Sequence, residues 1–239
     1  MEPKIKMAGD TCINLEFPNI MSEEVSERIL SIARRIEALH IPGILDIVPA
    51  YREVSFMFDP LVIDLANFKE ILAHELILKT QNQSVRTTAV FEIPVLYNEK
   101  VGLDLKEVAD IHGLSMDEVI SLHANREYRI YMLGFLPGFS FLGGLDPRLH
   151  TARKATPRLE IPAGSIAIGG EQTGYYPVTS PGGWQIIGQT PLKMFDSQQP
   201  TVIFHAGDAI KFLSIDEQKF RQLKNVSVND YFSKEKTDE

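Results

Sequence analysis

The sequence predicts an α+β protein in two parts, a small ferredoxin-like α/β unit followed by a small β-barrel or sandwich. Its 239 residues, 44% of them hydrophobic, are enough to form buried cores and exclude a disordered chain. Residues 10–79 alternate strand patterns with two long helical patterns. Between residues 128 and 215, by contrast, the strand patterns are short, and Gly and Pro are dense.

The N-terminal part contains five elements in the order strand, helix, strand, strand, helix. Residues 10–17 alternate polar and apolar side chains, as a half-buried strand does. Ser22 is a favourable N-cap for the helix that follows, and Pro42-Gly43 ends that helix. The remaining elements are expected at residues 44–48, 53–58 and 64–79. If residues 88–94 supply a last strand, the order is that of a split βαβ, ferredoxin-like unit.

The boundary between the two parts is expected in the polar stretch of residues 80–84, which lacks any apolar periodicity. We therefore predict an N-terminal α/β domain over residues 1–84 and a barrel domain over residues 85–230, the latter with an inserted helical hairpin. Residues 231–239 are rich in charge and are expected to form a frayed tail.

Two short helices and five strands are expected in the second part. Asp104 and Ser115 are each followed three positions later by a Glu, the pattern of a helix N-terminus, and Gly113 between them favours a tight turn. The best strand candidates are residues 129–135, 165–168, 184–188, 201–204 and 209–213. Short strands separated by frequent turns favour a barrel or sandwich over a helical fold.

Charge and cysteine content exclude several classes of protein. The chain has 24 Lys plus Arg against 32 Asp plus Glu, a formal net charge of −8, and no dense basic patch, so neither nucleic acid nor a membrane surface is an expected partner. The single Cys12 cannot form an internal disulfide, and the first residues contain no apolar stretch. We therefore expect a cytoplasmic protein.

Three motifs that resemble known sites are incomplete. Residues 104–123 have the length of a helix-turn-helix, but the second helix carries Asp117 and Glu118 where a DNA reader needs cations. His74-Glu75 begins a zinc-protease pattern that Leu78 breaks, and the His residues and lone Cys show no ligand spacing, so no metal is expected. Residues 169–174 are rich in Gly but lack the Lys and the following helix of a phosphate loop.

Two loops combine backbone freedom or rigidity with large rings, as a pocket rim does. They are residues 134–139 and 180–185, which serve equally well as barrel corners. Arg153 and Arg158 flank Thr156-Pro157, and two guanidinium groups near aromatic rings suit a carboxylate or phosphate. Surface exposure is the alternative fate of both arginines. The rings expected at the pocket are Phe135, Phe139, Tyr176 and Trp184.

His123 is the candidate for proton transfer. It ends the second short helix, where a cation interacts favourably with the helix dipole, and that structural role is the alternative. An imidazole with a pKa near its ordinary value could exchange protons with a ligand if it faces the barrel cleft.

These loops carry a resemblance to a known family. The segments that carry it are residues 131–139, 141–148, 155–158, 161–165, 172–174, 176–177 and 180–191, together with 9–10, 46–52 and 206–208. They resemble the 5-oxoprolinase B-subunit family, also called allophanate hydrolase subunit 1, which includes the Kip inhibitor of a sporulation histidine kinase. The resemblance spans essentially the whole chain and implies a small α/β domain followed by a cyclophilin-like β-barrel.

The resemblance also implies an activity and partners. It implies ATP-dependent opening of 5-oxoproline to L-glutamate, with a larger C-type subunit homologous to allophanate hydrolase subunit 2 and a lactamase-like A-type subunit. ATP would be bound by, or shared with, the larger partner chain. Arg153 or Arg158 would hold the substrate carboxylate, and Gln172, Ser180 or the backbone at Gly182-Gly183 would position the lactam.

One loop departs from the family pattern. Relatives usually carry a Cys-Tyr-Gly-Gly-Glu run after the Ile-Pro-Val strand. In residues 96–104 of this chain, Asn98 and Glu99 stand in place of the two Gly residues, and Lys100 stands in place of the Glu. If this loop lines the active site, catalysis is weakened or absent. The alternative function is then a protein inhibitor of a sensor histidine kinase, of the Kip inhibitor type, without its own catalysis. Prolyl isomerase activity, a third hypothesis, rests on the fold alone.

Overall fold

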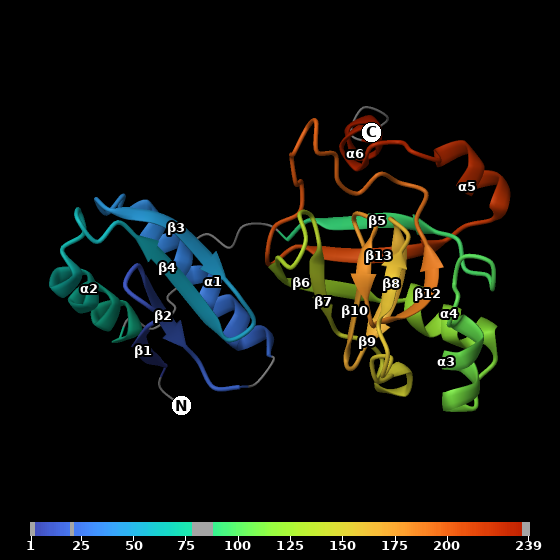
Figure 1. Cartoon of the computed structure of the whole chain (residues 1–239), viewed down its shortest axis with the longest axis horizontal. Coiled ribbons are helices and arrows are strands. Elements are labelled where there is room, and N and C mark those ends of the chain that lie inside the picture. The colour runs from blue at the N-terminus through green and yellow to red at the C-terminus, as the bar shows by residue number, and fades with distance from the viewer. Residues whose placement is uncertain (1–2, 20–21, 78–87, 236–239) are drawn as a thin grey trace. The chain divides into compact units, whose positions relative to one another are not determined.

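The structure, a computed structural model, describes residues 3–19, 22–77 and 88–235. The chain divides into two compact units, Met1–Thr88 and Ala89–Glu239, and each is considered by itself (Figure 1). The expected boundary at residues 84 and 85 lies outside the described residues, as does the polar stretch of residues 80–84. Within the described ranges, no helix is long and apolar enough to cross a membrane.

The N-terminal unit is a four-stranded antiparallel sheet with two helices against it. Its elements are β1 (Lys4–Met7), β2 (Cys12–Glu16), α1 (Glu23–Ala38), β3 (Ile44–Pro49), β4 (Glu53–Phe58) and α2 (Leu65–Ile77). The strand order is β1-β2-β4-β3. Alternate residues of β2 and β4, such as Ile13 and Phe56, are fully buried against apolar residues of the helices, such as Ile32 and Phe68, which explains the two sequence periodicities.

The fourth strand of this sheet is not the one the sequence predicts. β1 takes the edge beside β2 through a hairpin, in which the Ala8 amide donates to the Cys12 carbonyl at 2.9 Å. Residues 88–94, expected to complete a ferredoxin-like unit, instead contribute to β5 (Val90–Val95), which pairs in parallel with β13 (Ala209–Ser214) in the second unit. The prediction is wrong because β1, which a short hairpin joins to β2, already supplies the fourth strand at the edge of the first sheet.

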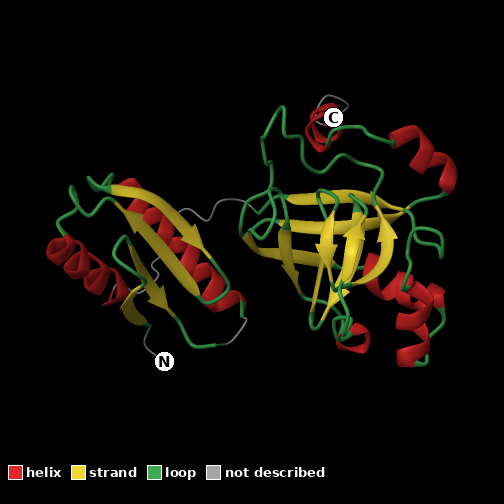
Figure 2. Ribbon diagram, viewed as in Figure 1, coloured by secondary structure: helices red, strands yellow, loops and turns green. Residues whose placement is uncertain are grey.

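The second unit is built on a nearly closed seven-stranded β-barrel (Figure 2). Its strands run in the order β12-β9-β10-β7-β6-β13-β5, and a two-stranded ribbon pairs β11 with β8. The further bounds are β6 (Glu127–Leu133), β7 (Ser140–Gly143), β8 (Arg158–Ile161), β9 (Ser165–Gly169), β10 (Gln172–Tyr175), β11 (Ser180–Gly182) and β12 (Gln185–Gln189). Leu96, just after β5, exchanges both backbone hydrogen bonds with Gln189, at 2.9 and 3.0 Å, and so connects the two outer strands.

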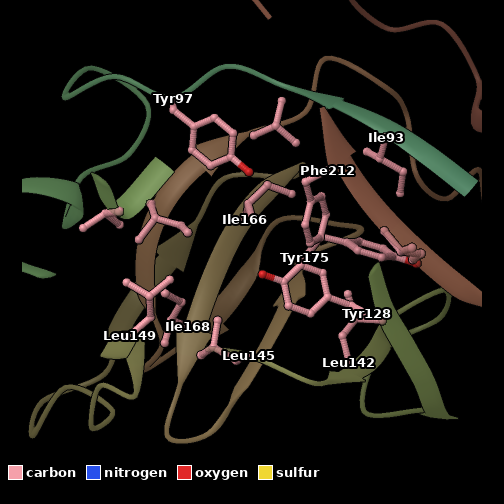
Figure 3. Close-up of a cluster of buried hydrophobic side chains, with 14 of the residues drawn as sticks. Ile93, Tyr97, Tyr128, Leu142, Leu145, Leu149, Ile166, Ile168, Tyr175 and Phe212 are labelled. Carbon is pink, nitrogen blue, oxygen red and sulfur yellow. The ribbon is translucent and has the colours of Figure 1, made fainter. Parts of the chain in front are cut away.

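Large side chains fill the barrel, so the interior is a core and not a channel. Tyr128, Tyr175 and Phe212 are fully buried and point inward from three different strands (Figure 3). The predicted strand at residues 201–204 is instead a loop, although Phe204 remains buried and its ring contacts Phe91 edge-on at 4.9 Å. The apolar pattern of residues 201–204 therefore reflects the burial of apolar side chains and not the pairing of a strand.

The helical hairpin is present as predicted, as α3 (Leu105–His112) and α4 (Met116–Ala124). Gly113 ends α3 in the left-handed conformation, with φ 64°, and Ser115 and Glu118 form a complete capping box at α4. Asp104 precedes α3, but its side chain makes no capping hydrogen bond. This carboxylate instead binds cations beside the pocket of the barrel unit.

The C-terminal segment is more ordered than the sequence predicts. It contains α5 (Glu217–Leu223) and α6 (Val228–Glu235), besides the short 3-10 helix η1 (Pro147–Leu149) earlier in the unit. Residues 231–235, expected in the charged tail, belong to α6 because Tyr231 and Phe232 pack against the barrel core. Residues 236–239 lie outside the described residues.

Candidate functional site

A cavity of about 210 Å³ opens on the barrel unit where three loops meet. The loops are the β6–β7 turn, the segment that leads into β8, and the β11–β12 connection. The residues that line the cavity are Phe135, Phe139, Phe141, Arg153, Lys154, Pro157, Tyr176, Gly182, Gly183 and Trp184. The two loops that the sequence singled out therefore meet in one pocket.

The floor of the pocket is aromatic. The Phe139 ring is 2% exposed and meets Trp184 and Tyr176 edge-on, at centroid distances of 5.7 and 5.8 Å. Gly182 is required at its position, because a Cβ there would overlap the Tyr176 hydroxyl. A small residue at this position thus allows the rings to surround a cavity.

Phe135 stands at the rim in a strained conformation. Its φ of 69° lies in the left-handed region, which is unfavourable for a bulky residue, and 67% of the residue is exposed. The turn is held by hydrogen bonds from the Gly134 amide to the Phe139 carbonyl, at 3.1 Å, and from the Phe139 amide to the Leu136 carbonyl, at 3.0 Å. Such strain costs about 1–3 kcal/mol and is concentrated at functional sites.

Arg153 is the available cation of the pocket. Its guanidinium carbon lies 5.6 Å from the centre of the Trp184 ring, a cation–π contact. Within the described part of the chain, its side chain has no hydrogen-bond or ion-pair partner, and the residue is exposed. A guanidinium fixed against a ring with its donors unused is suited to bind a carboxylate.

Arg158 and Lys154 are, in contrast, already paired. The Arg158 guanidinium donates to both oxygens of Asp104, at 2.8 and 2.7 Å, and Lys154 Nζ donates to Asp104 Oδ1 at 2.9 Å. Lys154 also donates to Glu107 at 2.9 Å and to Gln185 at 3.3 Å. The cluster connects the pocket wall to α3 and to β12.

Asp104 is ionised within this cluster. Its side chain is 2% exposed, and burial alone would raise the pKa of the carboxyl, but hydrogen bonds from Arg158, the Ile186 amide and Lys154 together lower the pKa below its ordinary value. The sequence identified Asp104 only as a helix cap. No local pattern revealed its role, because its partners lie about 50 or more positions later in the chain.

Four predicted site residues do not line the pocket: His123, Arg158, Gln172 and Ser180. Gln172 begins β10, and Ser180 is buried on β11 opposite Ile161. Three lining residues were not predicted from the sequence, although each is a close neighbour of one that was: Phe141, Lys154 and Pro157. The alternation of Phe139 and Phe141 along one strand face is the signal that could have identified Phe141.

His123 is a core residue, which corrects the proton-transfer prediction. It is fully buried, with Nδ1 2.8 Å from the Tyr97 hydroxyl and Nε2 2.7 Å from Thr173 Oγ1. Because Thr173 Oγ1 donates to the Ala167 carbonyl at 3.0 Å, it accepts from Nε2, and Tyr97 donates to Nδ1. Burial lowers the pKa of His123 to about 3, so the ring stays neutral and both nitrogens are occupied.

Other candidate sites are weaker. Residues 169–174 form the β9–β10 hairpin, with Gly170 in the left-handed conformation at the turn, and no helix follows to bind phosphate. Across residues 3–19, 22–77 and 88–235, no group of three or more His, Cys, Asp or Glu side chains is placed to hold a metal. A larger hollow of about 510 Å³, which Phe195 and Phe220 help to line, contains none of the predicted site residues.

Comparison with known proteins gives a consistent result. Residues 3–204 match the family described as "Carboxyltransferase domain, subdomain C and D". The chain is 38% identical to the 5-oxoprolinase B subunit of Bacillus subtilis (strain 168) over 235 residues, which covers 94% of this chain and 98% of that protein. It is 37% identical to the 5-oxoprolinase B subunit of Escherichia coli O157:H7 over 214 residues, covering 87% and 94%.

The fold is also similar to a solved structure. The crystal structure of TTHA0988 matches with a TM-score of 0.75 and 37% sequence identity, over 86% of this chain and 40% of that chain. This chain thus spans less than half of the solved protein. The aromatic pocket and its charged wall lie within the residues that the family covers.

Proposed function

The chain belongs to the carboxyltransferase domain, subdomain C and D, family, together with the 5-oxoprolinase B subunits, and on that premise we propose that it is one subunit of an ATP-dependent 5-oxoprolinase. The reaction opens the lactam ring of 5-oxoproline to L-glutamate with ATP and water. The observation that carries the proposal is a small aromatic pocket with one available guanidinium, that of Arg153.

The pocket suits the proposed substrate in size and chemistry. 5-Oxoproline is a compact five-membered ring with one carboxylate, and the cavity of about 210 Å³ is smaller than the roughly 300–1,000 Å³ of sites for drug-sized ligands. The ring would lie against Phe139 and Trp184, with its carboxylate on Arg153. The rings would cover the apolar face of the ligand, while the exposed guanidinium supplies two hydrogen-bond donors to the carboxylate.

Two glycines leave the backbone open to the ligand. Gly182 and Gly183 line the cavity without side chains, and the Gly183 carbonyl accepts a hydrogen bond from the Lys154 amide at 2.7 Å, which fixes the loop. We assign the lactam to this surface, where the backbone orients it. Gln172 and Ser180 lie outside the pocket lining and receive no role in this proposal.

ATP and the proton-transfer group are assigned to a partner. The Gly-rich residues 169–174 form a hairpin and do not fit a phosphate-binding loop, and His123 is enclosed in the core. The relatives are named as the B subunit of an enzyme, which supports an assembly with other subunits. We propose a larger chain of the allophanate hydrolase subunit 2 type and a lactamase-like chain as the partners.

The altered loop does not count against an active site in this pocket. Residues 96–103 contribute nothing to the pocket lining. Asn98 Oδ1 accepts hydrogen bonds from the Lys100 and Val101 amides, at 3.0 and 3.1 Å, so the loop is stabilised by its own polar side chain. The enzyme proposal is therefore preferred over an inhibitor of a sensor histidine kinase.

The test is purification of the tagged chain from its native cells, with identification of the co-purifying chains. A larger partner and ATP hydrolysis that depends on 5-oxoproline are expected. Arg153→Ala in the same complex is expected to raise KM about tenfold to a hundredfold, because a hydrogen bond to a charged group contributes about 1.5–3 kcal/mol. Arg34→Ala, on an exposed face of α1, is the matched control. A histidine kinase in the eluate, without turnover, would overturn the proposal.

A further inference from the structure

Two acidic residues neutralise part of the charge beside the pocket. Resting on the proposed function, we infer that Asp104 and Glu107 determine specificity: they set the charge of the pocket so that it accepts a ligand with one carboxylate and discriminates against a ligand with two. Neither residue is among the pocket-lining residues, so both act through the cations that they bind.

The charge count follows from the contacts. Three cations lie at or beside the pocket: Arg153, Lys154 and Arg158. Two carboxylates, Asp104 and Glu107, bind Lys154 and Arg158, which leaves three positive charges minus two negative ones, a net charge of +1. Arg153, stacked on Trp184, carries the charge that remains available.

The geometry makes this neutralisation hard to undo. Arg158 binds Asp104 through two parallel hydrogen bonds, and the Asp104 side chain is 2% exposed, so withdrawal of Arg158 toward a ligand would leave a buried carboxylate short of partners. Lys154 Nζ is held by three acceptors at once. Neither cation is free to follow a second carboxylate.

The consequence concerns the proposed substrate and product. Closed 5-oxoproline has one carboxylate and a neutral amide, whereas hydrolysis of that amide creates a second carboxylate together with an ammonium group. The second carboxylate would find no unpaired cation, because Asp104 and Glu107 already neutralise Lys154 and Arg158. The pocket is therefore expected to prefer a ring with one carboxylate over a ring with two, a comparison in which no ammonium group takes part.

Tryptophan fluorescence can measure this selectivity directly. Trp184 is the single tryptophan of the chain and lines the pocket, so its emission reports ligand binding to the isolated full-length protein. The probes are 5-oxoproline and a matched pair, cyclopentanecarboxylate and trans-cyclopentane-1,2-dicarboxylate. At neutral pH and low salt, the wild type is expected to bind the monocarboxylate about tenfold more tightly than the dicarboxylate, since the second carboxylate loses solvation without gaining a cation.

Asp104→Asn removes one negative charge and keeps the size of the side chain. It is expected to improve binding of the dicarboxylate and to reduce the selectivity about fivefold, the effect of one unit charge in partly solvated surroundings. Glu107→Gln, at a side chain that is 52% exposed, is expected to shift the selectivity about twofold in the same direction, because solvent screens it. Asp110→Asn, on the same helix and paired with Lys106, is the matched control without effect.

Each outcome has a defined meaning. Equal weakening of both probes by Asp104→Asn would show a merely structural role and overturn the inference. If Asp104→Asn does not fold, unchanged selectivity in Glu107→Gln overturns it instead. Failure of 5-oxoproline itself to change the wild-type Trp184 emission would overturn the proposed function, whereas binding of 5-oxoproline with unchanged selectivity in both variants overturns the charge inference alone.

Discussion

Arg153 and His123 are both chemically capable side chains of the barrel unit, but their surroundings differ. The His123 ring lies in the core, where Tyr97 donates to one nitrogen and Thr173 accepts from the other. Arg153 lies at the pocket, stacked on Trp184, with its hydrogen-bond donors unused by any described residue. The comparison shows that a closed hydrogen-bond chain stabilises the fold, whereas an unsatisfied group at a cavity is available to a ligand.

Arg158 sharpens the same comparison. It is the same residue type as Arg153 and lies only five positions later in the chain. Both guanidinium groups are near Tyr176, where burial raises the pKa of the phenol and the two positive charges oppose that rise. Only Arg158 has a buried carboxylate as its partner. Residue type and sequence position therefore do not distinguish the ligand-binding role of Arg153 from the structural role of Arg158. The presence of a buried carboxylate partner does distinguish them.

The largest expected effect is on stability and comes from the core. His123→Ala is expected to lower the free energy of unfolding by about 3–5 kcal/mol, since it leaves a cavity and removes the hydrogen-bond partner of two buried hydroxyls. Arg153→Ala, in the other region, should change it by less than about 0.5 kcal/mol. Urea denaturation of both variants measures the difference. Equal destabilisation by the two changes would contradict the assignment of roles.

Acid should act on the core in a defined direction. The pKa of His123 is about 3 in the folded protein against 6.5 for a free imidazole, so below pH 6.5 the unfolded chain binds a proton that the folded state excludes. The contribution of His123 to stability is therefore lost as pH falls from about 6.5 toward about 3, by about 1.4 kcal/mol per pH unit.

Denaturation of the wild type and His123→Gln at several pH values tests this linkage. The stability difference between them is expected to shrink as pH decreases, because the variant has no imidazole at this site to protonate. His205→Gln, at a side chain that is 59% exposed, is the control in the same unit. A difference that stays constant between neutral and acid pH would show that burial of the imidazole is not what determines the response.

A smaller effect is expected at the pocket glycines. Gly182→Ala would place its Cβ against Tyr176 and Ile161 and is expected to destabilise the barrel unit by about 1–3 kcal/mol through overpacking. Gly183→Ala, the adjacent position, would meet its nearest neighbour at 3.6 Å, an ordinary contact, and should be nearly neutral in stability. Thermal unfolding of both variants measures this. Similar melting temperatures would refute the close packing of Tyr176 on Gly182.

The smallest effect concerns the strained rim. Phe135→Gly and Phe135→Ala both remove the exposed ring, but only Gly accepts a φ of 69° without strain. The Gly variant is therefore expected to be more stable than the Ala variant by about 1 kcal/mol, although Gly is ordinarily the less stable choice. Chemical denaturation compares the two. The opposite order would mean that the turn relaxes once the ring is gone.

Local signals allowed part of this structure to be predicted. Ser22, Gly113 and the Ser115–Glu118 capping box each make hydrogen bonds or turns with residues only a few positions away. For this reason the start of α1, the end of α3 and the start of α4 could be predicted. The loops of the pocket were also found from sequence, because Gly, Pro and large rings are concentrated there.

Long-range pairing could not be predicted. The partner of β5 is β13, more than 100 positions later, and the Asp104 carboxylate binds Arg158 although its place before α3 favours a helix cap. His123 was misjudged for the same reason, since its neighbours Tyr97 and Thr173 come from distant segments. Sequence patterns report burial and local geometry, but they do not report which distant polar group satisfies a given side chain.

The most direct test of the central claim is a Trp184 fluorescence titration of the full-length protein with 5-oxoproline, comparing the wild type with Arg153→Ala and Arg34→Ala. Saturable binding in the wild type and Arg34→Ala, with affinity lowered about tenfold or more in Arg153→Ala, is the predicted result. Equal affinity in all three proteins, or no binding in any of them, would contradict the assignment of Arg153 as the carboxylate-binding residue of the pocket.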